Sequence, residues 1–441
     1  MSEVSFSALP LAEPLQRVLR ERGYTHPSPI QAQAIPPLLE GRDLIGCAQT
    51  GTGKTAAFSL PLLQLLDQSP RSRSGQTKAL ILVPTRELAV QVDASLETYG
   101  RYLRCTRALV YGGVSPVPQI RAMRRGVDFL VATPGRLLDL QHQGHIDLSQ
   151  VRHLVLDEVD QMLDMGFLPD VRRICAMLPV KRQALFFSAT LAPAMKELAS
   201  TIVRNPVVIT IAPERPTVER IQQQVCYVAG KEKRSLLEHV TREETMSAHD
   251  ARTLVFSRTK HGADKLAKQL SQAGLNASAI HGNKSQSQRQ RALEGFRDGR
   301  VPILVATDVA ARGLDIKGVS LVVNYDLPQV AETYVHRIGR TARANADGRS
   351  VSFCSEEDTG LLRDILRLTR HPLETLTDHP YHAGAVAAAA DRASQPSSSR
   401  GPMGKSGRSP RGRQGGGARH YSSSGPRDTR GRGPSHFGRA R

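Results

Sequence analysis

The chain has 441 residues, a formal net charge of +19 and an isoelectric point near 10.2. This length exceeds one ordinary hydrophobic core, so two or more domains are expected. The charge predicts a polyanionic partner, most simply nucleic acid; a solvated basic surface without a partner is the alternative. Five scattered cysteines with no Cys-x-x-Cys pair argue against a zinc site or a disulfide framework.

The N-terminal residues and the cysteine pattern also bear on location. Glu3, Pro10 and Glu13 leave no apolar core for a signal peptide, and no apolar run approaches membrane-spanning length. Scattered cysteines are typical of a reducing compartment. We therefore expect a cytoplasmic protein without a membrane partner.

Short apolar runs alternate with amphipathic stretches along most of the chain. Two sets of runs, rich in Val, Leu and Ile at consecutive positions, indicate strands buried on both faces. The first set is Ala79–Val83, Phe129–Ala132, His153–Leu156 and Ala184–Phe187; the second is Thr253–Phe256, Ile303–Ala306, Leu321–Asn324 and Val351–Phe353. Helical periods lie between them, as in Glu87–Tyr99, Gly262–Ala273 and Gln286–Phe296. This βαβ repetition predicts an α/β fold with two parallel sheets.

The expected domain boundaries follow from breaks in this pattern. Pro206, Pro213 and Pro216 interrupt both periods near Pro206–Arg220, so the seam is expected there. We predict a first domain over 1–210, a second over 218–375, and a disordered basic tail over 380–441. From Asp391 onward the tail carries twelve basic and two acidic residues among Gly, Ser and Pro, with four Arg-Gly pairs. Such a tail is typical of RNA binding without sequence preference, with an inert solubilising segment as the alternative.

A glycine-rich turn follows the apolar run Asp43–Cys47 and precedes a helical stretch. It comprises Ala48, Gln49, Thr50, Gly51, Thr52, Gly53, Lys54 and Thr55. Such a turn lets backbone N–H groups approach phosphate oxygens at a helix N-terminus. We expect Lys54 to reach the β- and γ-phosphates and Thr55 to hold Mg²⁺. Cys47, beside this loop, is expected to be an inert buried thiol.

Two carboxylates follow the apolar run that ends at Leu156. A strand ending in Asp157 and Glu158 places them at the carboxyl edge of the sheet, where ligands bind. Asp157 is expected to hold Mg²⁺, directly or through water, and Glu158 to orient or deprotonate a water that attacks the γ-phosphate.

These residues resemble the DEAD-box RNA helicases over about residues 6–370. The segment Asp157–Asp160 matches the family's signature, and Gly23–Gln31 with Phe6 looks like its adenine-reading motif. Further matching segments, in the family's order, are Pro84–Leu88, Gly112–Gly113, Thr133–Arg136, Ser188–Thr190, Leu254–Thr259, His281–Gly282, Gln286–Arg289, Ala306–Asp308, Ala310–Asp315 and His336–Thr341. The resemblance implies two tandem RecA-like domains and an RNA-stimulated ATPase that separates short duplexes locally through ATP-driven domain closure.

The resemblance also implies residue roles. ATP contacts are expected from Phe6, Gln31 and Asp315 in addition to the phosphate loop; Phe6 has core packing as its alternative. Arg337 and Arg340 are expected to neutralise γ-phosphate charge on domain closure, with surface arginines as the alternative. Coupling residues are Asp160, Ser188, Thr190, Asp308, Arg312 and His336. RNA contacts are Thr85, Arg86, Gly113, Thr133, Gly135, Arg136, Gln286, Arg289 and Thr307.

The sequence departs from the family pattern at two positions, and two other functions stay open. Val159 stands where the family has Ala, and Ala342 where Gly is usual. The sequences at Asp164–Phe167 and His281–Lys284 look most like those of the bacterial RhlE-type branch. One rival is a non-processive ATP-dependent RNA clamp or remodeller; the other is an RNA-binding or annealing protein dominated by its tail. A DNA helicase is a weaker variant, and the sequence names no protein partner.

Overall fold

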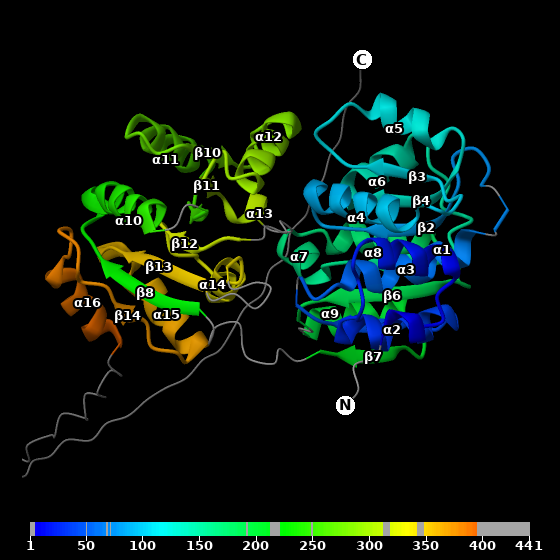
Figure 1. Ribbon diagram of the computed structural model, residues 1–441, viewed down its shortest axis with the longest axis horizontal. Helices are drawn as coiled ribbons and strands as arrows, with labels where there is room; N and C mark the ends of the chain where they lie inside the picture. Colours follow the sequence, from blue (N-terminus) through cyan, green and yellow to red (C-terminus); the bar gives the residue numbers. More distant parts are fainter. Residues whose placement is uncertain are drawn as a thin grey trace, which may run out of the picture. The chain divides into compact units, whose positions relative to one another are not determined.

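The computed structural model describes residues 5–49, 51–67, 69–70, 72–190, 193–211, 221–247, 250–311, 318–341 and 348–394. Within these residues the chain forms two seven-stranded sheets, one from each half of the sequence (Figure 1). Every pair of neighbouring strands in these two sheets is parallel. The two predicted parallel sheets are therefore confirmed.

The first sheet has the strand order β3-β4-β2-β5-β6-β1-β7. Its strands are β1 (Leu44–Cys47), β2 (Thr77–Leu82), β3 (Arg107–Val110), β4 (Val127–Ala132), β5 (His153–Leu156), β6 (Gln183–Ser188) and β7 (Val207–Thr210). Because side chains alternate along a strand, β2 sends Ala79 and Ile81 into one core and Leu80 and Leu82 into the other. Both faces of the sheet are thus apolar and need covering helices.

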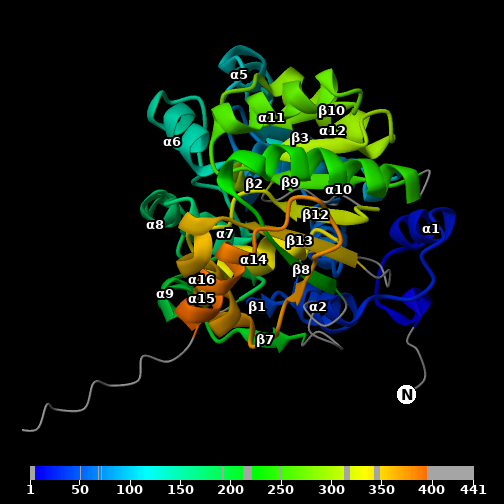
Figure 2. The same cartoon turned by 90° about the vertical axis from the view of Figure 1, so that its left-hand side faces the viewer.

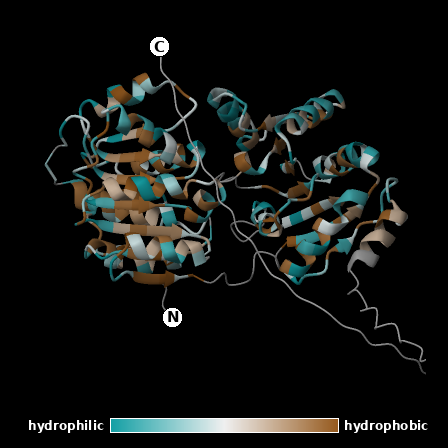
Figure 3. Ribbon diagram, turned by 180° about the vertical axis from the view of Figure 1, so that it is seen from behind, coloured by the Kyte–Doolittle hydropathy of each residue, from teal (hydrophilic) through white to brown (hydrophobic). Residues whose placement is uncertain are grey.

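Nine described helices cover these two faces. The first core is closed by α1 (Glu13–Glu21), α2 (Pro29–Leu39), α3 (Lys54–Asp67) and α4 (Arg86–Tyr99). The second is closed by α5 (Pro116–Met123), α6 (Pro134–His142), α7 (Val159–Asp164), α8 (Leu168–Met177) and α9 (Pro193–Ile202). Figure 3 shows hydrophobic colour along the enclosed strands and more hydrophilic colour on the covering helices.

The second sheet has the order β10-β11-β9-β12-β13-β8-β14, which repeats the topology of the first strand for strand. Its strands are β8 (Ile221–Tyr227), β9 (Thr253–Phe256), β10 (Ala277–Ile280), β11 (Ile303–Ala306), β12 (Leu321–Asn324), β13 (Gly348–Cys354) and β14 (Glu374–Thr375). The two halves are tandem RecA-like units of one topology.

Helices again lie on both faces of this sheet. One face carries α10 (Lys233–Ser247) and α11 (Lys260–Gln272); the other carries α12 (Gln286–Arg297), α13 (Asp308–Ala311), α14 (Ala331–Ile338), α15 (Thr359–Thr369) and α16 (Gly384–Ser394). In Figure 2, α14, α15 and α16 lie together, apart from α10 and α11. No helix in the described part of the chain is long and apolar enough to cross a membrane.

Each of the eight predicted runs overlaps a strand, and only Val83 lies one residue beyond the end of β2. The strands β3, β7, β8, β10 and β14 carried too weak a signal to be predicted. The edge strand β7 lies inside the expected seam and pairs with β1, so Pro206 precedes a strand there. Residues 212–220 of that seam lie outside the described residues. Helix α16 lies within the range assigned to the tail, and residues from 395 onward are also outside the described set.

The second half contains a buried ionic cluster centred on Asp358. Its carboxylate accepts hydrogen bonds from Lys233 Nζ at 2.6 Å, Arg258 Nη2 at 3.2 Å and Ser355 Oγ at 2.6 Å. Although burial opposes the charge, the bonds from Lys233 and Ser355 lower the pKa of Asp358. The cluster ties α10 to the turn before α15.

We predict that Asp358→Ala lowers the free energy of unfolding by about 3–5 kcal/mol, because it leaves the buried Lys233 ammonium without its carboxylate. Asp298→Ala, which removes an exposed pair with Arg300, is the control and should cost about 1 kcal/mol or less. Denaturant unfolding of both variants measures this. Because the pKa of Asp358 is lower in the folded protein than in the unfolded chain, the ionised carboxylate adds stability at pH values above the unfolded pKa. The difference in unfolding free energy between wild type and Asp358→Ala should therefore shrink as pH falls below about 4.

Candidate functional site

The phosphate loop joins the carboxyl end of β1 to the first residue of α3. Gly51 and Gly53 have φ values of 88° and 93°, in the left-handed region that favours glycine. Lys54, buried in the first turn of the helix, donates through Nζ to Ala48 O at 2.8 Å. The loop therefore curls around its own ammonium, with the helix N-terminus facing the same space. Thr50 lies outside the described residues.

Gln31 connects the predicted adenine-reading segment to this loop. Its Oε1 accepts from Ser28 N at 2.9 Å in a capping box at the start of α2, and its Nε2 donates to Gly53 O at 3.2 Å. A side chain at Gly53 would overlap the Gln31 amide. One N–H and one lone pair of that amide are left for a base. Sequence reasoning placed Ser28 in the adenine-reading segment but missed its capping role, although Ser-x-x-Gln before an apolar run signals such a box.

Phe6 lies beneath the same segment. The residue is 4% exposed and belongs to the first hydrophobic core, while its backbone N–H donates to Thr25 O at 3.0 Å. Core packing, the alternative named for this residue, accounts for the ring in this structure. The Phe6 backbone anchors the loop that leads to Gln31.

The carboxylates lie where they were expected, at the end of β5. Asp157 is 2% exposed and its Oδ1 accepts from Glu158 N at 3.0 Å. Glu158 has φ 54° and ψ 52°, a left-handed conformation that is strained for this residue and that begins α7. Burial raises the pKa of Asp157 to about 7; Lys54 opposes the shift, and Glu158 and Asp160 add to it.

The residues present fit a divalent cation. Three buried acids, Asp157, Glu158 and Asp160, interact with one buried ammonium, Lys54, so negative charge is in excess; burial is the main cause of the raised pKa of Asp157, and the two neighbouring carboxylates add to it. Thr55 supplies a hydroxyl from the first turn of α3. A carboxylate and a hydroxyl beside phosphate oxygens are the ligands that Mg²⁺ prefers.

Two contacts link this centre to Ser188–Thr190. Asp160 Oδ2 accepts from Ala189 N at 2.9 Å, and Ala48 N donates to Ser188 O at 3.0 Å. Ser188 is buried, whereas Thr190 is exposed. Burial also raises the pKa of the nearby Cys47 thiol, as expected of an inert cysteine.

The predicted RNA-contact loops lie at the carboxyl ends of β2, β3 and β4. Thr85 and Thr133 are the N-cap residues of α4 and α6, and the Thr85 hydroxyl accepts from Leu88 N at 3.2 Å. The Arg86 guanidinium lies against Gly113, which has φ 77° and no room for a side chain. Arg136 donates to Val114 O at 3.1 Å, whereas the space around Gly135 is open.

Positive charge accumulates around Gly113. Burial, followed by the guanidinium groups of Arg289 and Arg136, lowers the pKa of Arg86. Arg289 is itself paired with the buried Glu87 at 2.8 Å, and Gln286 donates to Glu87 at 3.2 Å. Sequence reasoning placed Glu87 in the segment Pro84–Leu88 but did not predict its pairing with Arg289 and Gln286, because those partners are about two hundred residues away in sequence. The guanidinium groups at this loop repel one another, and a bound anion such as phosphate would reduce that repulsion.

In the second half, Arg337 is enclosed by its own domain. It is 2% exposed and binds Asp308 in a fork, through Nε at 2.6 Å and Nη2 at 2.8 Å. Its Nη1 donates to Asn324 Oδ1 and Asp326 O, two partners that the sequence did not predict. This burial argues against the alternative that Arg337 is a surface arginine. Its contacts give Arg337 a structural role within its own domain.

Two other predicted residues of this half, Arg340 and Thr307, have defined contacts within it. Arg340 is buried and donates to His336 O at 3.2 Å. Thr307 follows β11 directly, and its N–H donates to Ile280 O at 3.3 Å. Arg312 and Asp315 lie outside the described residues.

Gly113→Ala should lower the free energy of unfolding by about 1–2 kcal/mol, because alanine disfavours the left-handed conformation. It should also displace the Arg86 guanidinium. The matched control, Gly135→Ala, lies in the first turn of α6 with open space around it and should gain about 0.5–1 kcal/mol. Denaturant midpoints compare the two; equal shifts would contradict the assignment.

Arg337→Lys should destabilise the nucleotide-free protein by about 1.5–3 kcal/mol. Lysine keeps the charge but cannot form the fork to Asp308 while also reaching Asn324 and Asp326. Thermal unfolding without nucleotide measures this. An unchanged midpoint would mean that Arg337 acts only on a bound phosphate.

Comparison with known proteins identifies the family of this chain. Residues 28–198 match the family model described as DEAD/DEAH box helicase, and residues 232–345 match that of a helicase conserved C-terminal domain. The chain is 43% identical over 378 residues to "ATP-dependent RNA helicase DeaD" of Mycobacterium tuberculosis, covering 86% of this chain and 65% of the relative. Against the Escherichia coli K12 protein of that name, identity is 44% over 366 residues, covering 83% and 57%.

Two further similarities extend over most of the compared protein. The chain is 42% identical over 374 residues to "RNA helicase CrhR" of Synechocystis, covering 85% of this chain and 74% of the relative. The structure of Saccharomyces cerevisiae Dbp5 bound to RNA and ADP BeF3 matches with a TM-score of 0.74 and 31% identity, covering 89% of this chain and 100% of that chain. This chain thus spans less than two thirds of the DeaD relatives. It belongs to the DEAD/DEAH box helicase family.

Proposed function

We propose that the protein is an ATP-dependent RNA helicase that separates short duplexes locally and reads little sequence. The observation that carries this proposal is the placement of two sites on one sheet edge. The phosphate loop and buried carboxylates follow β1 and β5, and the Arg86–Gly113–Arg136 group follows β2, β3 and β4. Relatives named RNA helicases and a relative's RNA-bound structure support the same activity.

In the nucleotide site, each group has an assigned task. Lys54 and the loop N–H groups hold the phosphates, and the free N–H and lone pair of Gln31 read adenine, with Phe6 supporting the segment from below. Asp315 is proposed to bind the ribose. Thr55 and Asp157 would hold Mg²⁺, which when bound neutralises phosphate charge. Glu158 orients or deprotonates the attacking water.

In the RNA site, hydroxyls, arginines and open backbone meet the sugar-phosphate chain. The Thr85 hydroxyl accepts a bond within α4 and keeps its own O–H to donate. Arg86 and Arg136 supply charge, Gly113 makes room for the Arg86 guanidinium, and the open space around Gly135 allows close approach. Such groups recognise phosphate and 2′-OH rather than base edges, so sequence preference should be weak. Thr133, Gln286, Arg289 and Thr307 are proposed to extend this contact.

Coupling between the two sites is proposed to run through the Asp160–Ala189 bond and, in the second half, through the Arg337–Asp308 fork. Ser188, Thr190, Arg312 and His336 are proposed to take part. Arg337 and Arg340 are proposed to neutralise the γ-phosphate when the domains close.

Three further assignments remain proposals. The domain limits are 1–210 and 218–375, with a tail over 380–441 whose first part includes α16, a helix that packs on the second half. The sequences at Asp164–Phe167 and His281–Lys284 support assignment to the RhlE-type branch, although the relatives compared above bear other names. The free cysteines of the described residues fit a cytoplasmic location.

Glu158→Gln should keep ATP and RNA binding but lower RNA-stimulated turnover by about a hundredfold or more, because it removes the general base while nearly keeping its shape. The control Glu197→Gln changes an exposed acid of the same half and should keep turnover. Phosphate release is measured with and without RNA. Near wild-type turnover in the Glu158 variant would remove that residue from the chemistry.

The same preparations separate the helicase from its rivals in a duplex assay. Strand separation that requires ATP and is lost with Glu158→Gln supports a helicase. RNA-stimulated ATPase without strand separation indicates a clamp or remodeller. Annealing without ATPase indicates an RNA-binding protein, and stimulation by DNA indicates a DNA helicase.

A further inference from the structure

Three polar side chains meet at the carboxyl end of β10, an edge strand of the second sheet. His281 directly follows β10, and Lys284 lies three residues further along the same turn. Both approach Asp264 of α11: His281 Nε2 lies 3.0 Å from Asp264 Oδ2, and Lys284 Nζ lies 2.8 Å from Asp264 Oδ1. The two oxygens of one carboxylate therefore hold both ends of the turn 281–284.

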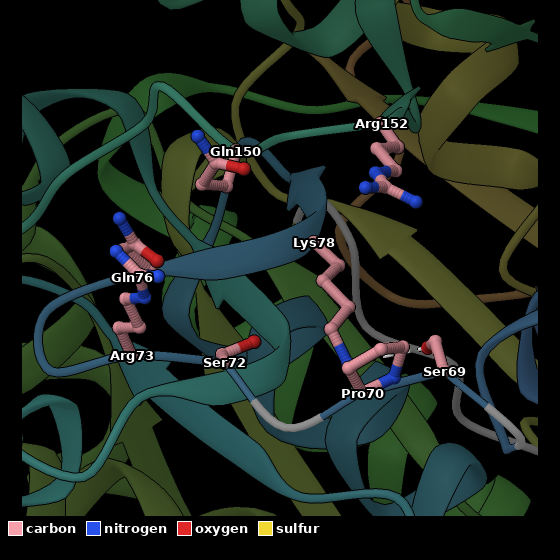
Figure 4. A pocket seen from close by; sticks show the side chains of 8 residues that line it. All are labelled: Ser69, Pro70, Ser72, Arg73, Gln76, Lys78, Gln150 and Arg152. Atoms are coloured by element: carbon pink, nitrogen blue, oxygen red, sulfur yellow. Dashed lines mark hydrogen bonds between the residues drawn. The ribbon is translucent and has the colours of Figure 1, made fainter.

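The convergence of these side chains is defined by their contacts. By contrast, the first half has an open pocket of about 280 Å³ whose lining includes Arg73, Lys78 and Arg152 (Figure 4). Figure 4 shows Arg73 and Arg152 on opposite sides of that pocket, and Lys78 is paired with Asp128 at 2.7 Å. The charged groups of the pocket do not meet, whereas those around Asp264 lie within ion-pair distance of one carboxylate.

The Asp264 contact links the two faces of the second sheet around the end of β10. Helix α11 buries Ala263, Leu266 and Leu270 in the core of one face, whereas α12 buries Leu293 and Phe296 in the core of the other. Both helices contact β10, as Figure 1 shows. The turn 281–285 joins β10 to α12, so a contact from α11 to this turn connects elements that the sheet otherwise separates.

The carboxylate of Asp264 is ionised at neutral pH. Although burial opposes the charge, the contacts with Lys284 and His281 lower the pKa of Asp264. Lys284 supplies a positive partner, and an imidazole with its proton on Nε2 presents an N–H to the carboxylate in either protonation state. The attraction that holds the turn therefore needs no change of protonation near neutral pH.

The turn lies at the surface apart from His281, which is buried. Gly282, Asn283 and Ser285 are exposed, so packing contributes little to their position. The bond from Lys284 N to His281 O at 3.1 Å closes the turn upon itself and does not tie it to another element. Asp264 thus provides the ionic anchor between this turn and α11.

The same turn determines how α12 begins. Ser285 is the N-cap residue: its Oγ accepts from Gln288 N at 3.3 Å, and its N–H donates to Gln288 Oε1 at 3.0 Å. Arg289 N donates to Ser285 O at 3.0 Å. The direction in which Gln286 and Arg289 leave the helix therefore depends on the position of Ser285, which directly follows Lys284.

The proposed RNA-contact residues of the second half all adjoin this turn. Gln286 and Arg289 lie in the first turn of α12. Thr307 donates through its N–H to the carbonyl of Ile280, the residue before His281, at 3.3 Å. A displacement of the turn would therefore move the groups that are expected to meet RNA.

We propose that Asp264 is a positioning residue for RNA binding, which acts by holding the turn 281–285 so that Gln286 and Arg289 face the RNA backbone. This inference rests on the proposed function. It concerns a residue that lies outside the segments matched to the family. By charge alone, removing an acid beside RNA would strengthen binding. The proposal predicts weaker binding, because the lost geometry outweighs the gain in charge.

The test compares Asp264→Asn with the matched control Asp298→Asn in the full chain. Each substitution removes one carboxylate charge, and Asp298 lies at the other end of α12, where it pairs with Arg300 at 2.8 Å. Asp264→Glu, which keeps the charge, is the conservative variant. Affinity for single-stranded RNA is measured with a non-hydrolysable ATP analogue present, and ATPase turnover is measured at saturating RNA. Amide hydrogen exchange without RNA reports on the turn itself.

Asp264→Asn should weaken RNA affinity about fivefold or more, with turnover at saturating RNA within about twofold of wild type. Asp264→Glu should recover part of that affinity, and Asp298→Asn should not lose any. In Asp264→Asn alone, the amides of Lys284, Gln288 and Arg289 should exchange about tenfold faster than in wild type.

Unchanged or tighter RNA binding by Asp264→Asn overturns the proposal, because the released Lys284 would then only add positive charge. An equal loss in Asp298→Asn, or a matching fall in saturating turnover, also overturns it, since either points to a general effect on the domain. If wild type binds RNA but shows no RNA-stimulated ATPase, the helicase proposal fails, while the affinity and exchange measurements still decide the role of Asp264.

Discussion

The nucleotide site depends on the parallel pairing of β1 with β6, and of β6 with β5. In this register Cys47 lies opposite Ser188, and Leu156 lies opposite Phe186. Residues that leave these strands must therefore emerge side by side, although about a hundred residues separate them in sequence. The phosphate loop, the acidic pair and Ser188–Thr190 meet because three strands end at one edge. The Asp160–Ala189 and Ala48–Ser188 bonds then fix their spacing.

Buried charge is treated differently in the two halves. In the first, several acids surround Lys54, and the pKa of Asp157 is raised because burial and like charge disfavour ionisation. In the second, Asp358 is matched by Lys233 and Arg258, and its pKa is lowered. Unbalanced charge suits a site that awaits a cation, whereas balanced charge suits a scaffold. The same residue types thus serve binding in one half and stability in the other.

The repeated topology sharpens this contrast. In each half the helix that follows the first strand begins with a buried lysine, Lys54 in α3 and Lys233 in α10. Lys54 is enclosed by a glycine-rich loop and donates to the Ala48 carbonyl. Lys233 instead binds Asp358 and Tyr325 O. In the second half, the Asp358 carboxylate neutralises the Lys233 ammonium, which is therefore not available to bind a phosphate.

The sequence by itself determined the two parallel sheets, because strands buried on both faces need unbroken apolar runs such as Ala79–Val83. It also determined the phosphate loop and carboxylates, since glycine spacing and an acidic strand end are local features. Edge strands such as β7 and β10 escaped prediction because they are short and half-exposed. Their identity depends on pairing with a neighbour, which local propensity does not encode.

Only the tertiary structure decided how side chains are shared. It committed part of Gln31 to Gly53, placed Phe6 in the core and enclosed Arg337 with Asp308 and Asn324. It also brought Asp264 of α11 to His281, beyond the end of β10. These contacts join residues distant in sequence, and their geometry depends on strand register and helix packing. Motif spacing along the chain carries no information about either.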